Sequence, residues 1–149
     1  MYNIMKTLIT LIATAVFTFL TSTLSAANMP DPLKFAKVET IIDHYINATG
    51  KGNTDLLDYL FTEDFTQTTP NKQNKEKHNR KEVIGHLKTL KNMEFACDTD
   101  VEFVEKNDDC SIVKITKSFA NFQRIDYVTM CNTEDGWKIN KVLVAYPNR

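Results

Sequence analysis

The chain has 149 residues, which is enough for one compact domain and short for two. Its 18 basic and 19 acidic side chains nearly cancel, so the composition does not suggest a nucleic-acid partner. The locally basic stretch Lys72–Lys81 also contains Glu76 and lies between two expected elements, so we interpret it as a solvated loop and not as a phosphate-binding patch.

The N-terminal segment has the pattern of a secretory signal peptide. Lys6 precedes an apolar run, Leu8–Leu20, and small residues follow at Ser25 and Ala27. We expect cleavage after about Ala27, which predicts a secreted or periplasmic protein without stable membrane insertion. The alternative is an uncleaved membrane anchor, but the run is shorter than the roughly 20 residues that a membrane span needs. Residues 28–34 then form a linker to the domain.

An amphipathic helix is predicted to open the domain. Asp31 followed by Pro32 indicates its N-cap and first helical position, and Gly50 and Gly52 indicate its end. Between these residues apolar side chains recur at spacings of three and four: Phe35, Val38, Ile41, Ile42, Tyr45 and Ile46. This stripe should face the core of the domain.

Two short elements follow. A helix of about two turns is expected to begin at Asn53 or Thr54 and to bury Leu56, Leu57, Leu60 and Phe61. The period then changes, and Phe65–Pro70 predicts a Thr-rich, half-exposed strand that ends at the proline.

A third helix and a run of strands complete the chain. Asn79 with Glu82 three residues later is a capping-box pattern, and this helix should end near Asn92. Turn residues then separate four predicted strands: Met93–Glu105, Ser111–Phe119, Arg124–Asn132 and Trp137–Tyr146. Helices followed by a meander of antiparallel strands indicate an α+β domain with its helices on one face of a curved sheet.

The order of these elements and the C-terminal sequence together resemble a known superfamily. The helix, helix, strand, helix order and a meander ending in "DGWKINKVLVAY" are similar to the nuclear transport factor 2-like cone fold, NTF2-like for short. Within it, "RIDYVTMCNTEDGWKINKV" resembles the group labelled putative lumazine-binding. The resemblance implies an NTF2-like domain over residues 35–149, with three N-terminal helices packed on a curved, mainly antiparallel sheet. Such a cone has an interior cavity, where the sites of this superfamily lie.

The first half of the domain also resembles the ketosteroid isomerases of the same superfamily. In those enzymes a helix tyrosine stabilises an oxyanion, and a carboxylate just before a proline acts as the base. Laid along that pattern without gaps, Tyr45 falls on the tyrosine and Thr69 falls on the carboxylate. A threonine hydroxyl cannot accept a proton at neutral pH, so the donor is retained and the base is not.

We therefore expect non-catalytic binding of a small apolar molecule in the cavity, with no cofactor. The candidate ligand-binding residues are Tyr45, Phe65, Thr69, Tyr127 and Trp137. Tyr45 and Trp137 also suit structural roles, as a core side chain and as an anchor of the last strand.

Two alternatives stay open. The protein could be an isomerase or hydrolase of the same superfamily in which Tyr45 polarises an oxygen and Asp126 transfers a proton. Asp126 and Tyr127 are neighbours on one strand and point to opposite faces, so only one of them can enter the cavity. The protein could instead be an interaction module that forms a homodimer through the outer face of its sheet.

Three cysteines lie in the exported part, where disulfides can persist, and their odd number leaves at least one unpaired within a monomer. If the strands that hold Cys110 and Cys131 form a hairpin, these two cysteines are within bridging range; the alternative is buried free thiols. Neither the cysteines nor the histidines have the spacing of a zinc site. We expect the histidines at the surface: His44, His78 and His86.

Overall fold

The computed structural model describes residues 30–70 and 75–147, and its compact unit begins at Asp31. The expected signal peptide, residues 1–27, lies outside the described residues, so export stays a prediction. Within the described ranges, no helix is long and apolar enough to cross a membrane.

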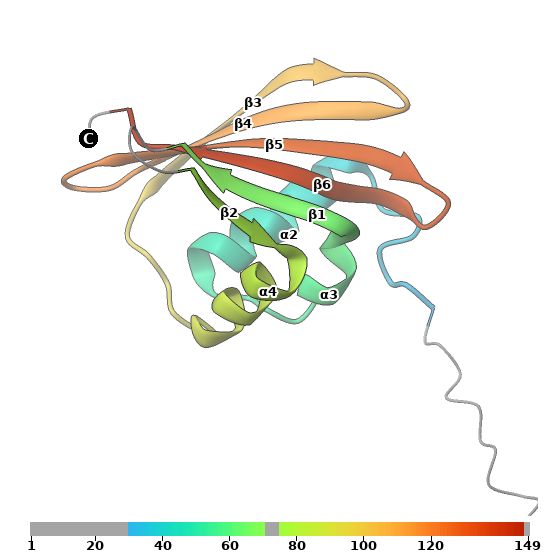
Figure 1. Ribbon diagram of the computed structural model, residues 1–149, viewed down its shortest axis with the longest axis horizontal. Coiled ribbons are helices and arrows are strands. Elements are labelled where there is room, and N and C mark those ends of the chain that lie inside the picture. The colour runs from blue at the N-terminus through green and yellow to red at the C-terminus, as the bar shows by residue number, and fades with distance from the viewer. Residues whose placement is uncertain (1–29, 71–74, 148–149) are drawn as a thin grey trace, which may run out of the picture. The chain divides into compact units, whose positions relative to one another are not determined.

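Three helices and six strands make up the described part of the chain (Figure 1). In chain order they are α2 (Val38–Lys51), α3 (Leu57–Leu60), β1 (Phe61–Thr69), β2 (Glu76–Asn79), α4 (Arg80–Thr89), β3 (Asp98–Lys106), β4 (Cys110–Ser118), β5 (Gln123–Thr133) and β6 (Gly136–Ala145). The strands form one sheet in the order β2-β1-β6-β5-β4-β3. Neighbouring strands are antiparallel except β1 and β6, which are parallel.

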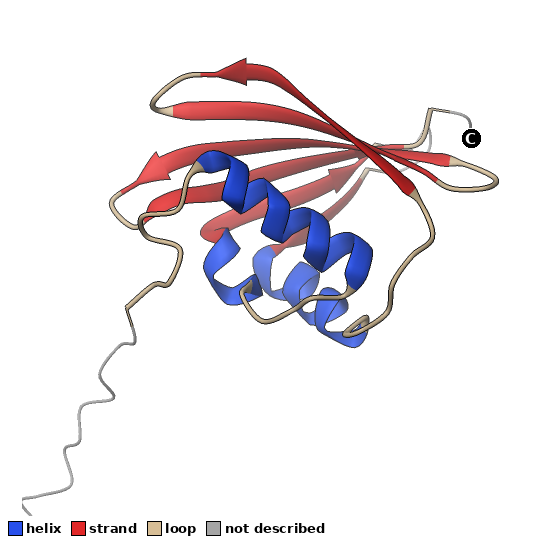
Figure 2. Cartoon of the chain, turned by 180° about the vertical axis from the view of Figure 1, so that it is seen from behind, coloured by secondary structure: helices blue, strands red, loops and turns tan. Residues whose placement is uncertain are grey.

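All three helices lie against one face of this curved sheet, which we call the inner face (Figure 2). The other face is the outer face. The predicted class is therefore confirmed: an α+β domain with three helices on a curved, mainly antiparallel sheet.

The first helix begins later than predicted. The carboxylate of Asp31 accepts a hydrogen bond of 2.7 Å from the backbone N–H of Leu33, so it caps a local turn and not a helix. Leu33 is buried by this turn, whereas Phe35 is 93% exposed and does not belong to the apolar stripe. The helix α2 runs from Val38 to Lys51 and is capped by Gly52, whose φ of 63° is the left-handed conformation that glycine favours after a helix end.

The capping box of α4 is present as predicted. The side chain of Asn79 accepts a hydrogen bond of 3.0 Å from the backbone N–H of Glu82, and the Glu82 carboxylate accepts one of 2.9 Å from the N–H of Asn79. The helix α4 ends at Thr89, before the expected Asn92. The helix α3 is only one turn long, because the chain is already extended from Phe61, where β1 begins.

Two strand predictions were wrong in detail. The stretch interpreted as a solvated loop contains β2, a short edge strand that pairs with β1. Its residues are charged or polar, as is common for edge strands, so hydrophobic periodicity could not reveal it. The strand predicted from Met93 begins only at Asp98, because the preceding residues form a loop in which the N–H of Phe95 donates to the carbonyl of Gly50.

The core lies between the inner face and the helices. Seven buried side chains of the sheet alternate along β4, β5 and β6: Val113, Ile115, Val128, Met130, Ile139, Val142 and Val144. They pack against Ile41, Ile42 and Tyr45 of α2 and against Leu57 and Leu60 of α3. By contrast, all nine residues of β3 are exposed, and this edge of the sheet extends beyond the helices (Figure 2).

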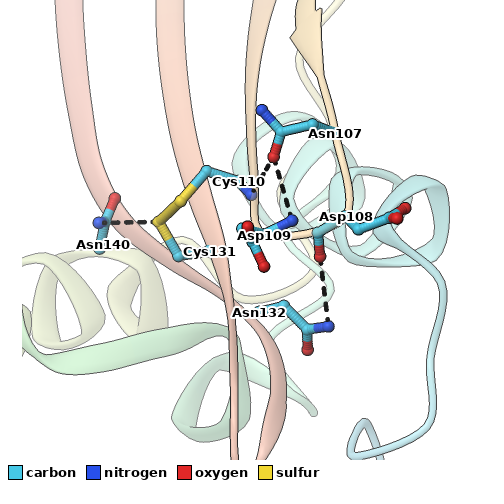
Figure 3. Close-up of a disulfide and its surroundings, with 7 residues drawn as sticks. All are labelled: Asn107, Asp108, Asp109, Cys110, Cys131, Asn132 and Asn140. Carbon is cyan, nitrogen blue, oxygen red and sulfur yellow. Dashed lines mark hydrogen bonds between the residues drawn. A yellow bond between two sulfur atoms is a disulfide. The ribbon is translucent and has the colours of Figure 1, made fainter.

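A disulfide joins Cys110 to Cys131, the pair named from the sequence, and Cys97 is a free thiol. The two bonded cysteines are directly opposite in the register of β4 and β5 (Figure 3). The turn before β4 is held by Asn107, whose side-chain oxygen accepts hydrogen bonds from the N–H groups of Asp109 and Cys110. The hairpin expected around this pair is therefore confirmed.

Candidate functional site

A cavity of about 630 Å³ opens between the inner face and the helices. The apolar part of its lining consists of Val83, Leu87, Leu90, Phe95, Phe119 and Phe122. Two of these rings, Phe119 and Phe122, stack with their centroids 4.5 Å apart. Cavities of this size and lining are typical of small-molecule sites.

Polar side chains occupy both the deep and the exposed parts of this cavity. Tyr45 and Lys117 are 1% and 2% exposed and therefore lie at its inner end. Thr49 bonds to Lys117 there, and Arg124, opposite Lys117 in register, is 26% exposed and extends from this end toward solvent. The other polar residues of the lining are Tyr146, just after β6, and six residues of β1, β2 and α4: Gln67, Thr69, Glu76, His78, Glu82 and His86. The cavity thus combines an apolar body with a polar inner end.

The inner end is organised around Asp126, which is completely buried. Its Oδ1 accepts a hydrogen bond of 2.7 Å from Nε of Arg124, and its Oδ2 accepts one of 3.0 Å from the hydroxyl of Tyr45. The ammonium of Lys117 lies 4.0 Å from Oδ2 and donates a hydrogen bond to Thr49. We call these five residues the Asp126 cluster.

The electrostatics of the cluster follow from its burial. Burial lowers the pKa of Lys117 from 10.5 to about 8, although Asp126 counteracts this effect. Burial also raises the pKa of Tyr45 well above 10, and the neighbouring Asp126 adds to the shift. For Arg124 burial disfavours the charge, but Asp126, Tyr45 and Tyr146 together outweigh burial, and the pKa of the guanidinium lies above its ordinary value. Tyr45 is therefore a neutral donor, whereas Lys117 can change its charge in mildly alkaline solution.

This arrangement restricts what Asp126 can do chemically. One of its oxygens is occupied by a charged guanidinium and the other by the phenol of Tyr45. The Tyr45 proton points to Asp126, so in this geometry it does not point to a ligand oxygen. A general base must reach the proton that it abstracts, and Asp126 lies behind the residues that line the cavity.

The residues named from the sequence fall into different places. Tyr45 and Thr69 line the cavity, and Asp126 contacts Tyr45 from behind. Phe65 is buried in the core, where its ring packs 4.5 Å from the ring of Phe61. The remaining two are not among the cavity-lining residues: Tyr127 alternates with buried Asp126 and Val128 and so lies on the outer face, and Trp137 packs against the core.

Lys117 and Arg124 are functional candidates that the sequence reasoning missed. Lys117 follows Val113 and Ile115 at a spacing of two, so it stands in phase with buried positions of its strand. Arg124 and Asp126 have the same spacing on the next strand, which places opposite charges on one face. This cluster could have been predicted from charged residues that occupy the positions of a strand where the alternation pattern places buried apolar side chains.

The histidines also differ from expectation. His78 and His44 are half-buried, whereas His86 is exposed as expected; His78 and His86 both line the cavity. His44 does not line the cavity. No group of three His, Cys, Asp or Glu side chains is arranged to hold a metal ion in residues 30–70 and 75–147.

Comparisons with known proteins give a family and a fold. Residues 34–143 match the profile of the family described as "Putative lumazine-binding". Comparison with curated proteins gives no match. Among solved structures, the chain is similar to an NTF-2 like protein of unknown function from Silicibacter pomeroyi, with a TM-score of 0.61 and 15% identity over 72% of this chain and 91% of the other.

Two further solved structures support the same fold. An NTF2-like protein of unknown function from Shewanella baltica has a TM-score of 0.59 and 9% identity, over 74% of this chain and 91% of the other. A ketosteroid isomerase-like protein from Erwinia carotovora atroseptica has a TM-score of 0.56 and 12% identity, over 75% of this chain and 95% of the other. At these identities the similarity establishes the fold and leaves the chemistry to the site itself.

Proposed function

Since the chain belongs to the putative lumazine-binding family and has the NTF2-like fold, we propose that its cavity binds a small, largely apolar molecule without converting it chemically. The observation that carries this proposal is the cavity itself. It has a volume of about 630 Å³, six Val, Leu and Phe side chains in its lining, and a compact polar group at its inner end. Apolar walls supply affinity in such sites, and a few placed polar groups fix the orientation of the ligand.

The state of Asp126 favours binding over catalysis. An isomerase or hydrolase that used Tyr45 and Asp126 would need the carboxylate free to exchange a proton with the substrate. Here the carboxylate is buried, and both of its oxygens already accept hydrogen bonds, one from Arg124 and the other from Tyr45. The enzyme alternative therefore requires the Asp126–Arg124 pair to open when substrate binds.

We also propose that the protein works outside the cytoplasm, as a secreted or periplasmic protein. The support is the signal-peptide pattern of the N-terminal segment together with the Cys110–Cys131 disulfide, since disulfides persist mainly in oxidising compartments.

A homodimer through the outer face is the second candidate. Four apolar side chains remain partly exposed there: Ile112, Ile125, Tyr127 and Leu143. A dimer would cover them, and it is compatible with ligand binding on the inner face. Sedimentation equilibrium tests it: a dimer should become a monomer in Tyr127→Arg, and a monomeric wild type would exclude it.

The binding proposal is tested first by native mass spectrometry of the protein purified from its own host. A small molecule that is released on denaturation is expected. A panel of apolar and aromatic probes, including lumazine because the family description names it, is then titrated by calorimetry.

Two tryptophan variants on β1 locate the binding. Thr69→Trp should fill the cavity and abolish binding, because Thr69 lines it. Thr66→Trp is the matched control, because Thr66 alternates with the cavity-lining Gln67 and lies on the outer face. If no molecule co-purifies, and no probe binds the wild type better than it binds Thr69→Trp, the binding proposal is wrong.

A further inference from the structure

The charges of the Asp126 cluster do not balance. Lys117 on β4 and Arg124 on β5 are directly opposite in the register of the two strands, and both side chains reach the inner end of the cavity. Like charges in such a cross-strand pair repel each other. A single carboxylate, that of Asp126, lies between them and is already bonded to Arg124.

Of the two cations, Lys117 interacts less closely with the carboxylate of Asp126. Its ammonium is 4.0 Å from Asp126, which is beyond a normal hydrogen-bond distance, and it donates to the neutral hydroxyl of Thr49. An ammonium has three N–H donors and a guanidinium has five, so the two side chains offer more donors than Asp126 and Thr49 accept. With Lys117 only 2% exposed, bulk water contributes little to its solvation.

We propose that the ligand of this cavity is a monocarboxylic acid with an apolar body, and that its carboxylate binds at the inner end against Lys117 and Arg124. This inference rests on the proposed binding function and names the chemical class of the ligand. One additional negative charge makes the cluster neutral, with two cations and two carboxylates. The six apolar side chains of the cavity then surround the body of the acid.

A ligand with two or more negative charges fits less well. A second charge would exceed the two cations of the cluster, and the other charged cavity residues include Glu76 and Glu82. The carboxylate of Glu82 caps α4 and lies 3.8 Å from His78, so an anion beside this histidine would also be close to a carboxylate. These acids disfavour phosphate esters and dicarboxylates relative to a monoanion.

Three probes that share one ring system test the inference: naphthalene-2-carboxylate, naphthalene-2-carboxamide and 2-naphthylmethylamine. Their apolar bodies are alike, and their polar ends are similar in size but anionic, neutral and cationic, respectively. Calorimetry or ligand-observed NMR should give an affinity for the carboxylate at least about tenfold higher than for the amide, and the amine should bind most weakly.

Variants of β4 show whether Lys117 causes this preference. Lys117→Met should lower the affinity for the carboxylate about tenfold and leave that for the amide within about twofold, a split that general loss of structure would not produce. The variant should fold, because it removes the surplus cation and leaves the Asp126–Arg124 pair intact. Lys117→Arg keeps the positive charge and should retain the preference for the carboxylate over the amide. The matched control is Lys114→Met, whose lysine is on the same strand but pairs with Glu102 on the outer face.

The outcomes separate this inference from the binding proposal. Equal affinities for carboxylate and amide, or a preference that survives in Lys117→Met, would overturn the carboxylate assignment while apolar binding stands. If neither probe binds the wild type better than it binds Thr69→Trp, and nothing co-purifies, both proposals are wrong. A co-purified neutral or cationic molecule would also overturn the assignment.

Discussion

The hydroxyl of Tyr45 in α2 donates a hydrogen bond of 3.0 Å to the carboxylate of Asp126 in β5, a residue 81 positions later in the chain. Both side chains are buried, so the bond joins the helical layer to the centre of the sheet without competition from water. Arg124 and Lys117 complete the surroundings of the carboxylate. The same few atoms therefore contribute to the stability of the domain and to the chemistry of its cavity.

Replacing Asp126 should be far more damaging than replacing its phenol partner. Asp126→Asn leaves the buried Lys117 and the partly buried Arg124 without a counter-charge, and the free energy of unfolding should fall by about 3–5 kcal/mol. Tyr45→Phe removes a neutral donor and keeps the Asp126–Arg124 ion pair, so the free energy of unfolding should fall by only about 1–2 kcal/mol. Urea unfolding followed by tryptophan fluorescence measures both. Equal losses in the two variants would mean that the charge of Asp126 is not what stabilises the cluster.

The stability of the protein should increase in mildly alkaline solution because of Lys117. Its pKa is 10.5 in a solvated chain and about 8 in the folded protein. Below about pH 8 Lys117 is protonated in both the folded and the unfolded protein, and burial of its ammonium destabilises the folded state. Between the two pKa values the unfolded state binds more protons, so stability rises with pH. Relative to Lys117→Met, the free energy of unfolding of the wild type should rise by about 2 kcal/mol from about pH 7 to about pH 9.5.

The comparison with Lys117→Met cancels the other groups that titrate in this range. The charged and titratable neighbours of Lys117 are Asp126, Arg124, Tyr45 and Cys97, and all four remain in the variant. Tyr45 releases its proton only at higher pH, since its pKa is raised. A difference between wild type and variant that stays constant with pH would show that Lys117 has an ordinary pKa in the folded protein.

Much of the fold follows from local patterns in the sequence. The capping box at Asn79, the glycine that ends α2 and the turns between the last strands are determined by residues close together in the chain, and each was predictable. The edge strand β2 was not, because its pairing with β1 satisfies backbone groups and buries little apolar surface. The start of α2 was missed since Asp31 can cap either a helix or a turn.

The site was less predictable than the fold. Resemblance to known enzymes directed attention to Tyr45 and Thr69, and both do line the cavity. The alternation of β5 left open whether Asp126 or Tyr127 faces inward, because a single strand does not reveal which face is buried. Only the register of β4 and β5 brings Lys117 opposite Arg124, and register depends on tertiary packing.

Two glycine substitutions should have opposite effects. A Cβ atom added at Gly52 would overlap the carbonyl oxygen of Leu90, and the φ of 63° there is strained for other residues. Gly52→Ala should therefore lower the free energy of unfolding by about 2 kcal/mol or more. Gly85 is an exposed position of α4 with open space around its Cβ, so Gly85→Ala should raise it by about 0.5–1 kcal/mol. Destabilisation by Gly85→Ala would indicate that α4 has another partner at this position.

The disulfide should stabilise the domain without contributing to the cavity. It closes a loop with a sequence separation of 21, and its removal in the double variant Cys110→Ser/Cys131→Ser should lower the free energy of unfolding by about 3 kcal/mol through the entropy of the unfolded chain. Binding of the naphthalene probes should be unchanged, because neither cysteine lines the cavity. The matched control is Cys97→Ser, which removes the free thiol and should change stability by less than about 0.5 kcal/mol.

Thiol titration under denaturing conditions directly measures whether the Cys110–Cys131 disulfide is formed. Protein produced by export into an oxidising compartment should show one reactive thiol per chain before reduction, that of Cys97, and three after reduction. In Cys97→Ser the count before reduction should be zero. Three thiols in the unreduced exported protein would contradict the disulfide. The double variant should then be as stable as the wild type, because a disulfide restricts the unfolded chain only when the bond is formed.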